Sequence, residues 1–139
     1  MNVSKSHRTY FKAAKVVSEL SSFKQHRIGT VAIYKHKIIS SGCNSYTTNP
    51  LQKKYNKLRF DTDETLHSKH SELDCLLPII NRRDIDFSRV SLYIYREHKS
   101  GELACARPCK SCLALIKELG IRNIYYSNEG GFSHEEIIY

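Results

Sequence analysis

The sequence predicts an α/β protein in which helices cover a mixed sheet. Its helical and strand-like segments follow one another in the order α-β-β-α-β-α-β, an alternation typical of helices layered on a sheet. A chain of 139 residues suits one domain, so we expect a single domain over residues 1–139. The composition, 40% hydrophobic and 26% charged, is ordinary for a folded globular protein.

The first half of the chain predicts one helix and two strands. Apolar residues at helical spacing place a helix over residues 7–23. Two short β-branched segments, 28–35 and 37–42, predict adjacent strands with a turn near Lys35 and His36. The mostly polar segment 43–69 is long for a connection inside a compact domain, and such connections usually carry function.

The second half predicts two helices and two strands. Helical spacing resumes over 70–81, where Pro78 either kinks the helix or ends it near Leu77. Alternating apolar residues predict a strand over 89–95.

Pro108 suits the first position of the next helix, which Gly120 should end. A further strand is expected over 121–126, and no pattern defines the tail after it.

Composition also limits the class of protein. Apolar runs of only a few residues and a mean hydropathy of −0.47 exclude a transmembrane helix, so no membrane partner is expected. The N-terminal segment has no apolar signal-peptide core, which favours a cytoplasmic protein. Five cysteines, an odd number, favour metal binding or free thiols over a disulfide framework.

The chain is strongly basic. Its net charge of +8 favours anionic partners such as nucleotides, nucleic acid or phosphates. The other interpretation is that the charge only maintains solubility.

Two short motifs hold candidate metal ligands. Cys109 and Cys112 are three residues apart at a helix start, so their sulfurs share one face and thiolate is favoured. Alone, such a pair fits a metal site, a redox pair or ordinary thiols equally well. His70 alone is more often a core or surface residue than a ligand, but Glu72 beside it suggests a cleft at the sheet edge.

Together the two motifs resemble those of a known enzyme family. His70-Ser71-Glu72 and Pro108-Cys109-Lys110-Ser111-Cys112 match the H-x-E and P-C-x-x-C signature of zinc nucleobase deaminases. The chain resembles the cytidine/deoxycytidylate deaminase family over roughly residues 7–126. The resemblance implies a cytidine-deaminase-like three-layer α/β/α sandwich with a mixed central sheet.

The resemblance also implies roles for these residues. His70, Cys109 and Cys112 would bind Zn²⁺ and leave its fourth position to a water of lowered pKa. Glu72 would be the catalytic residue that moves protons from the water to the base and then to departing ammonia.

Candidate substrate-binding residues are less specific. Asn44 lies in a G-x-N segment that contacts the sugar in the family, although such an asparagine is often only a turn residue. The basic loop 52–60 contributes Lys53, Lys54 and Arg59, interleaved with Tyr55 and Phe60. It could bind phosphate or stack a nucleic-acid base, or it could be a solvated loop.

Arg107 could likewise bind phosphate or only balance nearby negative charge. We expect Cys43, Cys75 and Cys105 to be small buried thiols.

Two features depart from the family pattern. Ser71 stands where alanine is usual, and serine is nearly isosteric with it. Residues 96–107 form an insert before P-C-x-x-C, which should be a hairpin that remodels one wall of the pocket.

Three functions remain open at this stage. The first is a zinc-dependent hydrolase of nucleotide metabolism that converts a cytosine nucleotide or nucleoside, such as deoxycytidylate, to the uracil form with release of ammonia. The second is an editing deaminase acting on cytosine or adenine in single-stranded DNA or RNA. The third, a structural zinc module, would normally fill all four metal positions from the protein. The resemblance also implies a homo-oligomer.

Overall fold

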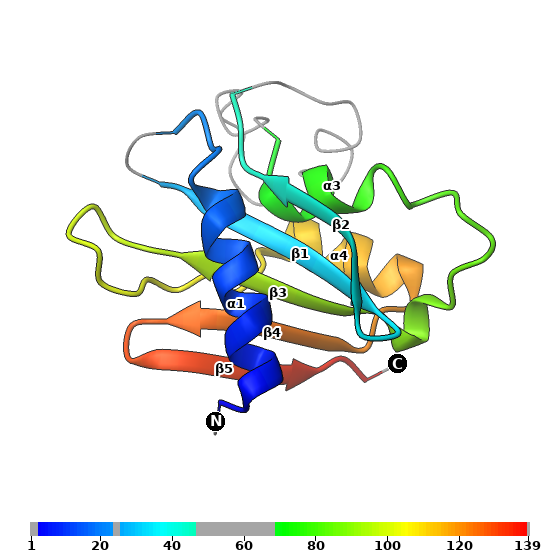
Figure 1. Ribbon diagram of the computed structural model, residues 1–139. Coiled ribbons are helices and arrows are strands. Elements are labelled where there is room, and N and C mark those ends of the chain that lie inside the picture. Colours follow the sequence, from blue (N-terminus) through cyan, green and yellow to red (C-terminus); the bar gives the residue numbers. More distant parts are fainter. Residues whose placement is uncertain (1–2, 24–25, 47–68, 139) are drawn as a thin grey trace.

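The fold is known from a computed structural model, which describes residues 3–23, 26–46 and 69–138 (Figure 1). Its centre is a five-stranded sheet in the order β2-β1-β3-β4-β5. The strands are β1 (Ile28–Tyr34), β2 (Lys37–Cys43), β3 (Ser91–Arg96), β4 (Asn123–Asn128) and β5 (Gly131–Glu136).

The sheet is mixed, as the sequence predicts. Strand β1 pairs antiparallel with β2 and β3, β3 and β4 run parallel, and β4 and β5 are antiparallel. The turn between β1 and β2 consists of Lys35 and His36, whose φ angles are both positive (50° and 63°). A two-residue hairpin turn of this kind requires positive φ at both residues, because its twist then matches that of the strands. The parallel pair requires a crossover, and helix α4 (Lys110–Leu119) lies in it.

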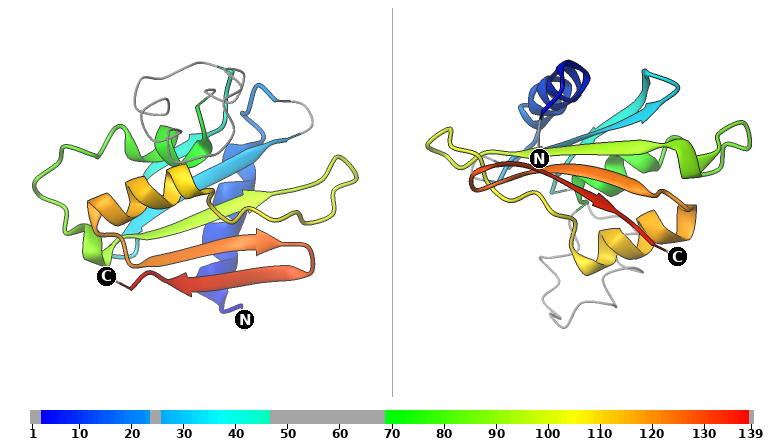
Figure 2. Two further views of the ribbon diagram at one scale, coloured as in Figure 1. Left: turned by 180° about the vertical axis from the view of Figure 1, so that it is seen from behind. Right: turned by 90° about the horizontal axis from the view of Figure 1, so that it is seen from below.

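One face of the sheet is covered by helix α1 (Lys5–Ser18), as Figures 1 and 2 show. The side chain of Ser4 caps its N-terminus by accepting from the backbone N–H of His7. Phe11 and Ala14 are buried against the sheet. The prediction that this helix extends to residue 23 is wrong, because the turn after Ser18 leads the chain back toward β1.

The other face carries helices α3 (Ser71–Leu76) and α4, which completes the expected three-layer α/β/α sandwich (Figure 2). Between these helices and the sheet lies the larger part of the core, with Leu76, Leu92, Ile116 and Ile124 fully buried. No helix in the ranges that the structure describes is long and apolar enough to cross a membrane.

Helix α3 is short because Pro78 ends it. Leu77 is its C-cap, so of the two alternatives for Pro78, termination is confirmed over a kink. Helix α4 ends at Gly120, which takes the left-handed conformation (φ 91°) that glycine adopts without strain. Pro108, however, does not begin α4: Cys109 is the N-cap, so Pro108 precedes the helix by two residues.

Strand β5 is an addition to the predicted order. It pairs only with β4 in the described structure and lies at one edge of the sheet. Its sequence lacks the regular apolar alternation that identifies a half-buried strand, which is why the tail showed no pattern.

Candidate active site

The N-termini of α3 and α4 bring the two sequence motifs together. His70 is the N-cap of α3, Cys109 is the N-cap of α4, and Cys112 is the third residue of that helix. The Nδ1 atom of His70 lies 3.3 Å from Cys112 Sγ and 3.6 Å from Cys109 Sγ. All three donor atoms lie within 4.8 Å of one another.

These three side chains fit a zinc ion. Zinc–nitrogen bonds of about 2.0 Å and zinc–sulfur bonds of about 2.3 Å at tetrahedral angles separate the donor atoms by about 3.5 Å. The two distances from His70 agree with that separation. One imidazole and two thiols are also donors that zinc accepts. The residues predicted from sequence to bind metal are therefore positioned to do so.

The electrostatics of the two sulfurs differ. A hydrogen bond from the Cys112 thiol, aided by the His70 ring, lowers the pKa of Cys109 to about 3. The same contact with Cys109, together with burial, raises the pKa of Cys112 well above its usual value. Cys109 therefore carries negative charge most readily, and a thiolate is the form that binds metal.

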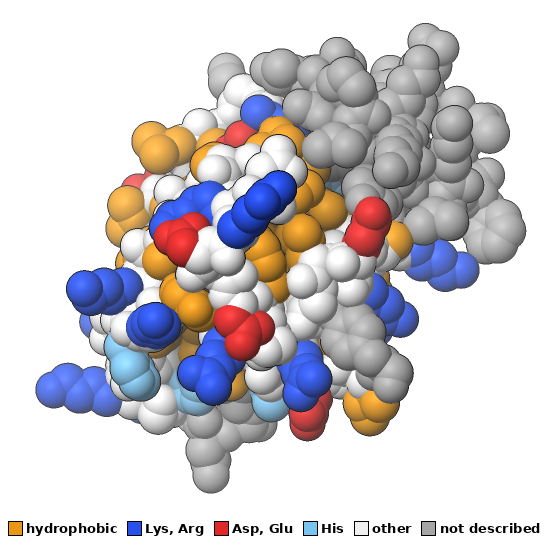
Figure 3. Space-filling view, turned by 90° about the vertical axis from the view of Figure 1, so that its right-hand side faces the viewer, with side chains coloured by type: hydrophobic (Ala, Val, Ile, Leu, Met, Phe, Trp, Pro, Cys, Tyr) orange, Lys and Arg blue, Asp and Glu red, His pale blue; other side chains and the backbone are white. Residues whose placement is uncertain are grey.

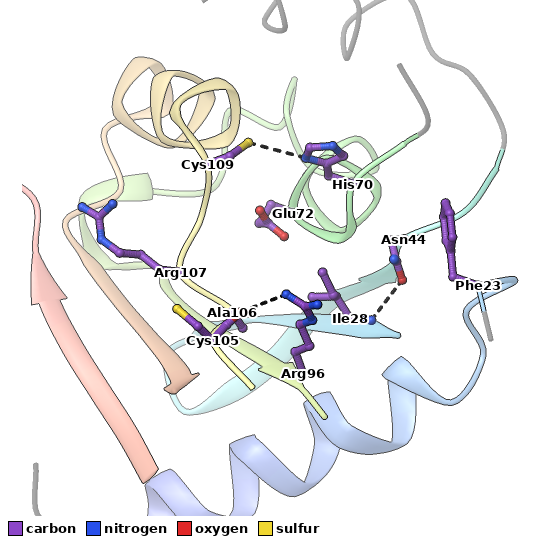
Figure 4. Close-up of a pocket in the computed structure, with 10 residues that line it drawn as sticks. All are labelled: Phe23, Ile28, Asn44, His70, Glu72, Arg96, Cys105, Ala106, Arg107 and Cys109. Atoms are coloured by element: carbon purple, nitrogen blue, oxygen red, sulfur yellow. Dashed lines mark hydrogen bonds between the residues drawn. The ribbon is translucent and has the colours of Figure 1, made fainter. Parts of the chain in front are cut away.

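Glu72 lies beside this group but outside it. It occupies the first turn of α3 and is only 5% exposed. Its Oε1 accepts a hydrogen bond of 2.5 Å from the hydroxyl of Ser71. Glu72, His70 and Cys109 line the same pocket, where Figure 4 shows Glu72 between His70 and the strands.

The pocket has a volume of about 320 Å³, and segments distant in the sequence form its walls. Phe23, Ile28, Asn44 and Arg96 line it together with residues 105–107, which end the insert before α4 (Figure 4). Those last residues are held in place because the Ser127 carbonyl accepts from Ala106 and the Ser127 hydroxyl donates to Ala104.

The insert itself is a hairpin, as predicted. Glu97 and Leu103 form an isolated bridge, and the backbone N–H of His98 donates to Glu102 at 2.8 Å. Its second arm leads directly into the pocket wall, so the insert forms one side of the pocket. That it remodels this wall relative to the family stays a prediction.

Asn44 lies in the pocket, but its side chain also supports the backbone. Its Oδ1 accepts from the backbone N–H of Ile28 at 3.0 Å and from the Ser21 hydroxyl at 2.6 Å. Its Nδ2 donates to the carbonyl of His26. Asn44 thus fastens the segment before β1 to the end of β2, and its contact with a sugar stays a prediction.

Two arginines line the pocket. Arg107, predicted from sequence, makes a bidentate ion pair with Glu135 of β5 at 2.8 and 3.1 Å. Figure 4 shows the Arg107 side chain directed away from Glu72. Arg96 extends into the pocket (Figure 4). One terminal nitrogen of Arg96 contacts His26 at 3.0 Å, while its buried Nε has no hydrogen-bond partner within the described ranges.

The remaining predicted residues divide into two groups. Lys53, Lys54 and Arg59 lie outside the residues that the structure describes. Of the three other cysteines, Cys75 is buried as expected, and burial raises the pKa of its thiol. Cys43 is only half-buried and Cys105 is exposed, so for these two the prediction of a buried thiol is wrong.

Two pocket residues, Phe23 and Arg96, carry almost no signal in the sequence that predicts their place. Phe23 contacts Tyr46 in a tilted arrangement, with ring centroids 4.0 Å apart and an interplanar angle of 37°. Neither residue belongs to a motif, and only the folded sheet brings them near His70. The one available signal was that Arg96 begins the insert that departs from the family pattern.

The positions of His70 and Glu72 depend on the close packing of α3 against β2. A Cβ on Gly42 would lie 2.2 Å from the backbone nitrogen of Cys75, so only glycine allows this approach. Asp74 accepts a hydrogen bond from the backbone N–H of Cys43 and forms a 2.8 Å ion pair with Lys69. These contacts fix the start of α3, and with it His70 and Glu72.

A three-layer fold with a His–Cys–Cys group beside a buried glutamate defines the class of zinc-dependent nucleobase deaminases. The chain belongs to the cytidine and deoxycytidylate deaminase family, because the profile of its zinc-binding region matches residues 4–128. It is therefore a zinc-dependent hydrolytic deaminase of cytosine compounds. No curated protein sequence gives a significant match.

Solved structures share the fold. The apo form of the dCMP deaminase from cyanophage S-TIM5 is 22% identical, with a TM-score of 0.60 over 88% of this chain and 82% of that one. The same phage enzyme with dCMP and dUMP is 21% identical, with a TM-score of 0.57 over 86% and 78%. A cytidine deaminase from Burkholderia pseudomallei is 15% identical, with a TM-score of 0.64 over 94% and 91%.

Proposed function

We propose that this protein deaminates a free cytosine nucleotide of the deoxycytidylate type, with His70, Cys109 and Cys112 as zinc ligands and Glu72 as the catalytic acid and base. The observation that carries the proposal is the placement of buried Glu72 at the same pocket as His70 and Cys109. In a structural zinc site, a buried carboxylate at the wall of a cavity would have no role.

The chemistry follows from this arrangement. Zinc, when bound, supplies a Lewis acid that makes water a better nucleophile at neutral pH. The Glu72 carboxylate takes a proton from the water that attacks C4 and delivers it to ring nitrogen N3. It then passes the water's second proton to the amino group, so that the C4–N bond breaks, ammonia leaves and the uracil carbonyl remains.

Charge at the pocket favours a phosphorylated substrate. Arg96 and Arg107 line the pocket, and Glu72 is the one acid among the lining residues that the structure describes. Glu135 already neutralises much of Arg107. The terminal nitrogens of Arg96 contact His26 and the carbonyl of Cys105 and no carboxylate within the described ranges, which leaves Arg96 as the better candidate for a phosphate contact. The phage dCMP deaminase with bound dCMP supports the same substrate class by similarity of fold.

A second candidate is an editing deaminase that acts on single-stranded nucleic acid. Tyr46 is 65% exposed and packs at a tilt against Phe23, which lines the pocket, and such an aromatic pair could hold a base next to the target. The basic net charge would also favour a polynucleotide.

A substrate comparison separates the two candidates. Zinc-loaded protein is incubated with dCMP, cytidine and a cytosine-containing oligonucleotide, and uracil formation is followed in each. We expect the highest kcat/KM with dCMP. Turnover of the oligonucleotide alone would overturn the proposal in favour of editing, and turnover of none of the three would exclude both.

The phosphate contact has its own test. Arg96→Ala should raise KM for dCMP about tenfold while leaving KM for cytidine unchanged, because one charge-assisted hydrogen bond to phosphate is lost. Arg8→Ala is the matched control, since Arg8 is exposed on α1 and does not line the pocket. An equal rise of KM for both substrates would mean that Arg96 does not contact the phosphate.

A further inference from the structure

Ser71 separates the metal-binding His70 from Glu72, and its hydroxyl does not face solvent. Ser71 is 1% exposed and lies on α3, while Thr30 is 0% exposed and lies in β1 beneath it. The two hydroxyl oxygens are 2.8 Å apart. The Ser71 hydroxyl also donates to Glu72 Oε1 at 2.5 Å.

The direction of these hydrogen bonds is fixed by proton count. A serine hydroxyl has a single proton, and the one on Ser71 goes to the Glu72 carboxylate. Thr30 must therefore be the donor in its contact with Ser71. The result is a chain that runs from Thr30 through Ser71 to Glu72, and successive hydrogen bonds of this kind strengthen one another inside a protein.

Ser71 and Glu72 are neighbours in the sequence, but neighbours on a helix do not normally form a hydrogen bond between their side chains. Consecutive residues on a helix point about 100° apart, so their side chains do not normally face each other. Since the Ser71 hydroxyl also contacts Thr30 of β1, its hydrogen bond holds the Glu72 carboxylate on the side of α3 that faces β1. A glutamate has several rotatable bonds, and this hydrogen bond selects one conformation among many.

We propose that Ser71 and Thr30 are positioning residues that hold the Glu72 carboxylate in the conformation needed for proton transfer. This inference rests on the proposed role of Glu72. Ser71 engages Oε1 of the Glu72 carboxylate, and Glu72 lines the pocket. Thr30 belongs to a strand paired on both sides, by β2 and β3, so these hydrogen bonds connect the carboxylate to an interior strand of the sheet.

The test uses four variants of the zinc-loaded protein. Ser71→Ala removes the donor to Glu72 and should lower kcat on dCMP about tenfold, with KM and zinc content unchanged. Thr30→Val should lower kcat by a smaller factor, and Thr30→Ser, which keeps the hydroxyl, should rescue it. The double variant should have the kcat of Ser71→Ala, because the chain is already broken.

Thermal unfolding distinguishes positioning from simple structural support. Ser71→Ala leaves the Thr30 hydroxyl buried without its partner and should lower Tm, whereas adding Thr30→Val removes that unpaired group and should restore Tm. Positioning predicts that Tm recovers in the double variant while kcat stays low. Recovery of both, or a Ser71→Ala protein with normal kcat, would overturn the proposal.

Ser18→Ala is the matched control. Ser18 is also a buried serine, 6% exposed, but it bonds to the Lys15 carbonyl and does not line the pocket. This variant should keep the kcat of the original protein. A loss of kcat equal to that of Ser71→Ala would show that removing any buried hydroxyl slows the enzyme, and would overturn the proposal.

A crystal structure tests whether Ser71 positions Glu72 without relying on a measurement of activity. In crystals of the zinc-loaded Ser71→Ala protein, the Glu72 carboxylate should leave its position or occupy more than one conformation. A single unmoved carboxylate would overturn the positioning role. If the original protein deaminates no cytosine compound, the proposed function fails on its own, and the crystal comparison still decides on Ser71.

Discussion

Glu72 lies beside the metal-binding group without belonging to it, so its substitution separates chemistry from metal binding. Glu72→Gln keeps the shape of the side chain but removes its ability to accept and return a proton. We expect kcat to fall about a thousandfold with zinc content unchanged, as measured by deamination rates and elemental analysis. Loss of zinc in this variant would show that Glu72 is itself a ligand.

The cysteines make the complementary prediction. Cys109→Ser and Cys112→Ser should each lose most of the bound zinc, because a serine hydroxyl is a far poorer zinc ligand than a thiolate. Cys43→Ser is the matched control, since Cys43 is half-buried in β2 and outside the metal-binding group. Zinc retained by both of the first two variants would contradict the ligand assignment.

At the residue scale, the sequence could predict those site residues that are close to one another along the chain. His70 with Glu72, and Cys109 with Cys112, are neighbours within single motifs, so their spacing was visible in the chain. Phe23 and Arg96 reach the pocket only through the folding of α1, β1 and β3. The contact between Ser71 and Thr30 could not be predicted for the same reason, because the two residues are 41 positions apart.

At the element scale, the approach of β2 to α3 sets the position of the site. Gly42→Ala would place a Cβ 2.2 and 2.6 Å from backbone atoms of Cys75 and Asp74, so one of the two elements must move. We expect the free energy of unfolding to fall by about 1–3 kcal/mol in urea titrations. Activity should fall as well, because α3 carries His70 and Glu72.

A second glycine provides the control for this prediction. Gly130 is in a turn, and a Cβ on it would meet no atom within 4 Å. Gly130→Ala should therefore leave the free energy of unfolding nearly unchanged. Equal stability of the Gly42 and Gly130 variants would show that the contact between β2 and α3 has room to relax.

The sequence could locate those helices and strands that have a regular apolar periodicity of their own. Strand β1 and helix α4 carry clear periodicity, and the bounds 28–34 and 110–119 agree with expectation within about two residues. Strand β5 is stabilised by pairing with β4 and not by an apolar pattern of its own, so no local signal marked it. The end of α1 at Ser18 packs closely on Gly29 of β1, and such a tertiary contact leaves no pattern in the local sequence.

At the scale of the whole molecule, the positive charge on the face shown in Figure 3 is dispersed. Lys and Arg side chains are spread over this face with acidic side chains among them, and its described residues form no continuous basic stripe. A dispersed charge suits a small anionic substrate at least as well as a polynucleotide, which needs a basic path to follow. The homo-oligomer implied by the family resemblance stays a prediction.

Zinc should also stabilise the whole molecule, because its proposed ligands come from two helices that are far apart in the sequence. Helices α3 and α4 lie on the same face of the sheet, and an ion bound by His70, Cys109 and Cys112 would link them. Binding a ligand at about a thousand times its dissociation constant stabilises the folded state by about 4 kcal/mol. For a chain of this length, removal of zinc should lower Tm by about 10 °C.

The measurement is thermal unfolding with and without a chelator, followed by addition of zinc. The original protein and Glu72→Gln should lose and regain the same Tm, because Glu72 does not hold the metal. Cys109→Ser should have a low Tm that neither chelator nor zinc changes, since its site no longer binds the ion well. A Tm of the original protein that is insensitive to the chelator would mean that the link between α3 and α4 does not depend on zinc.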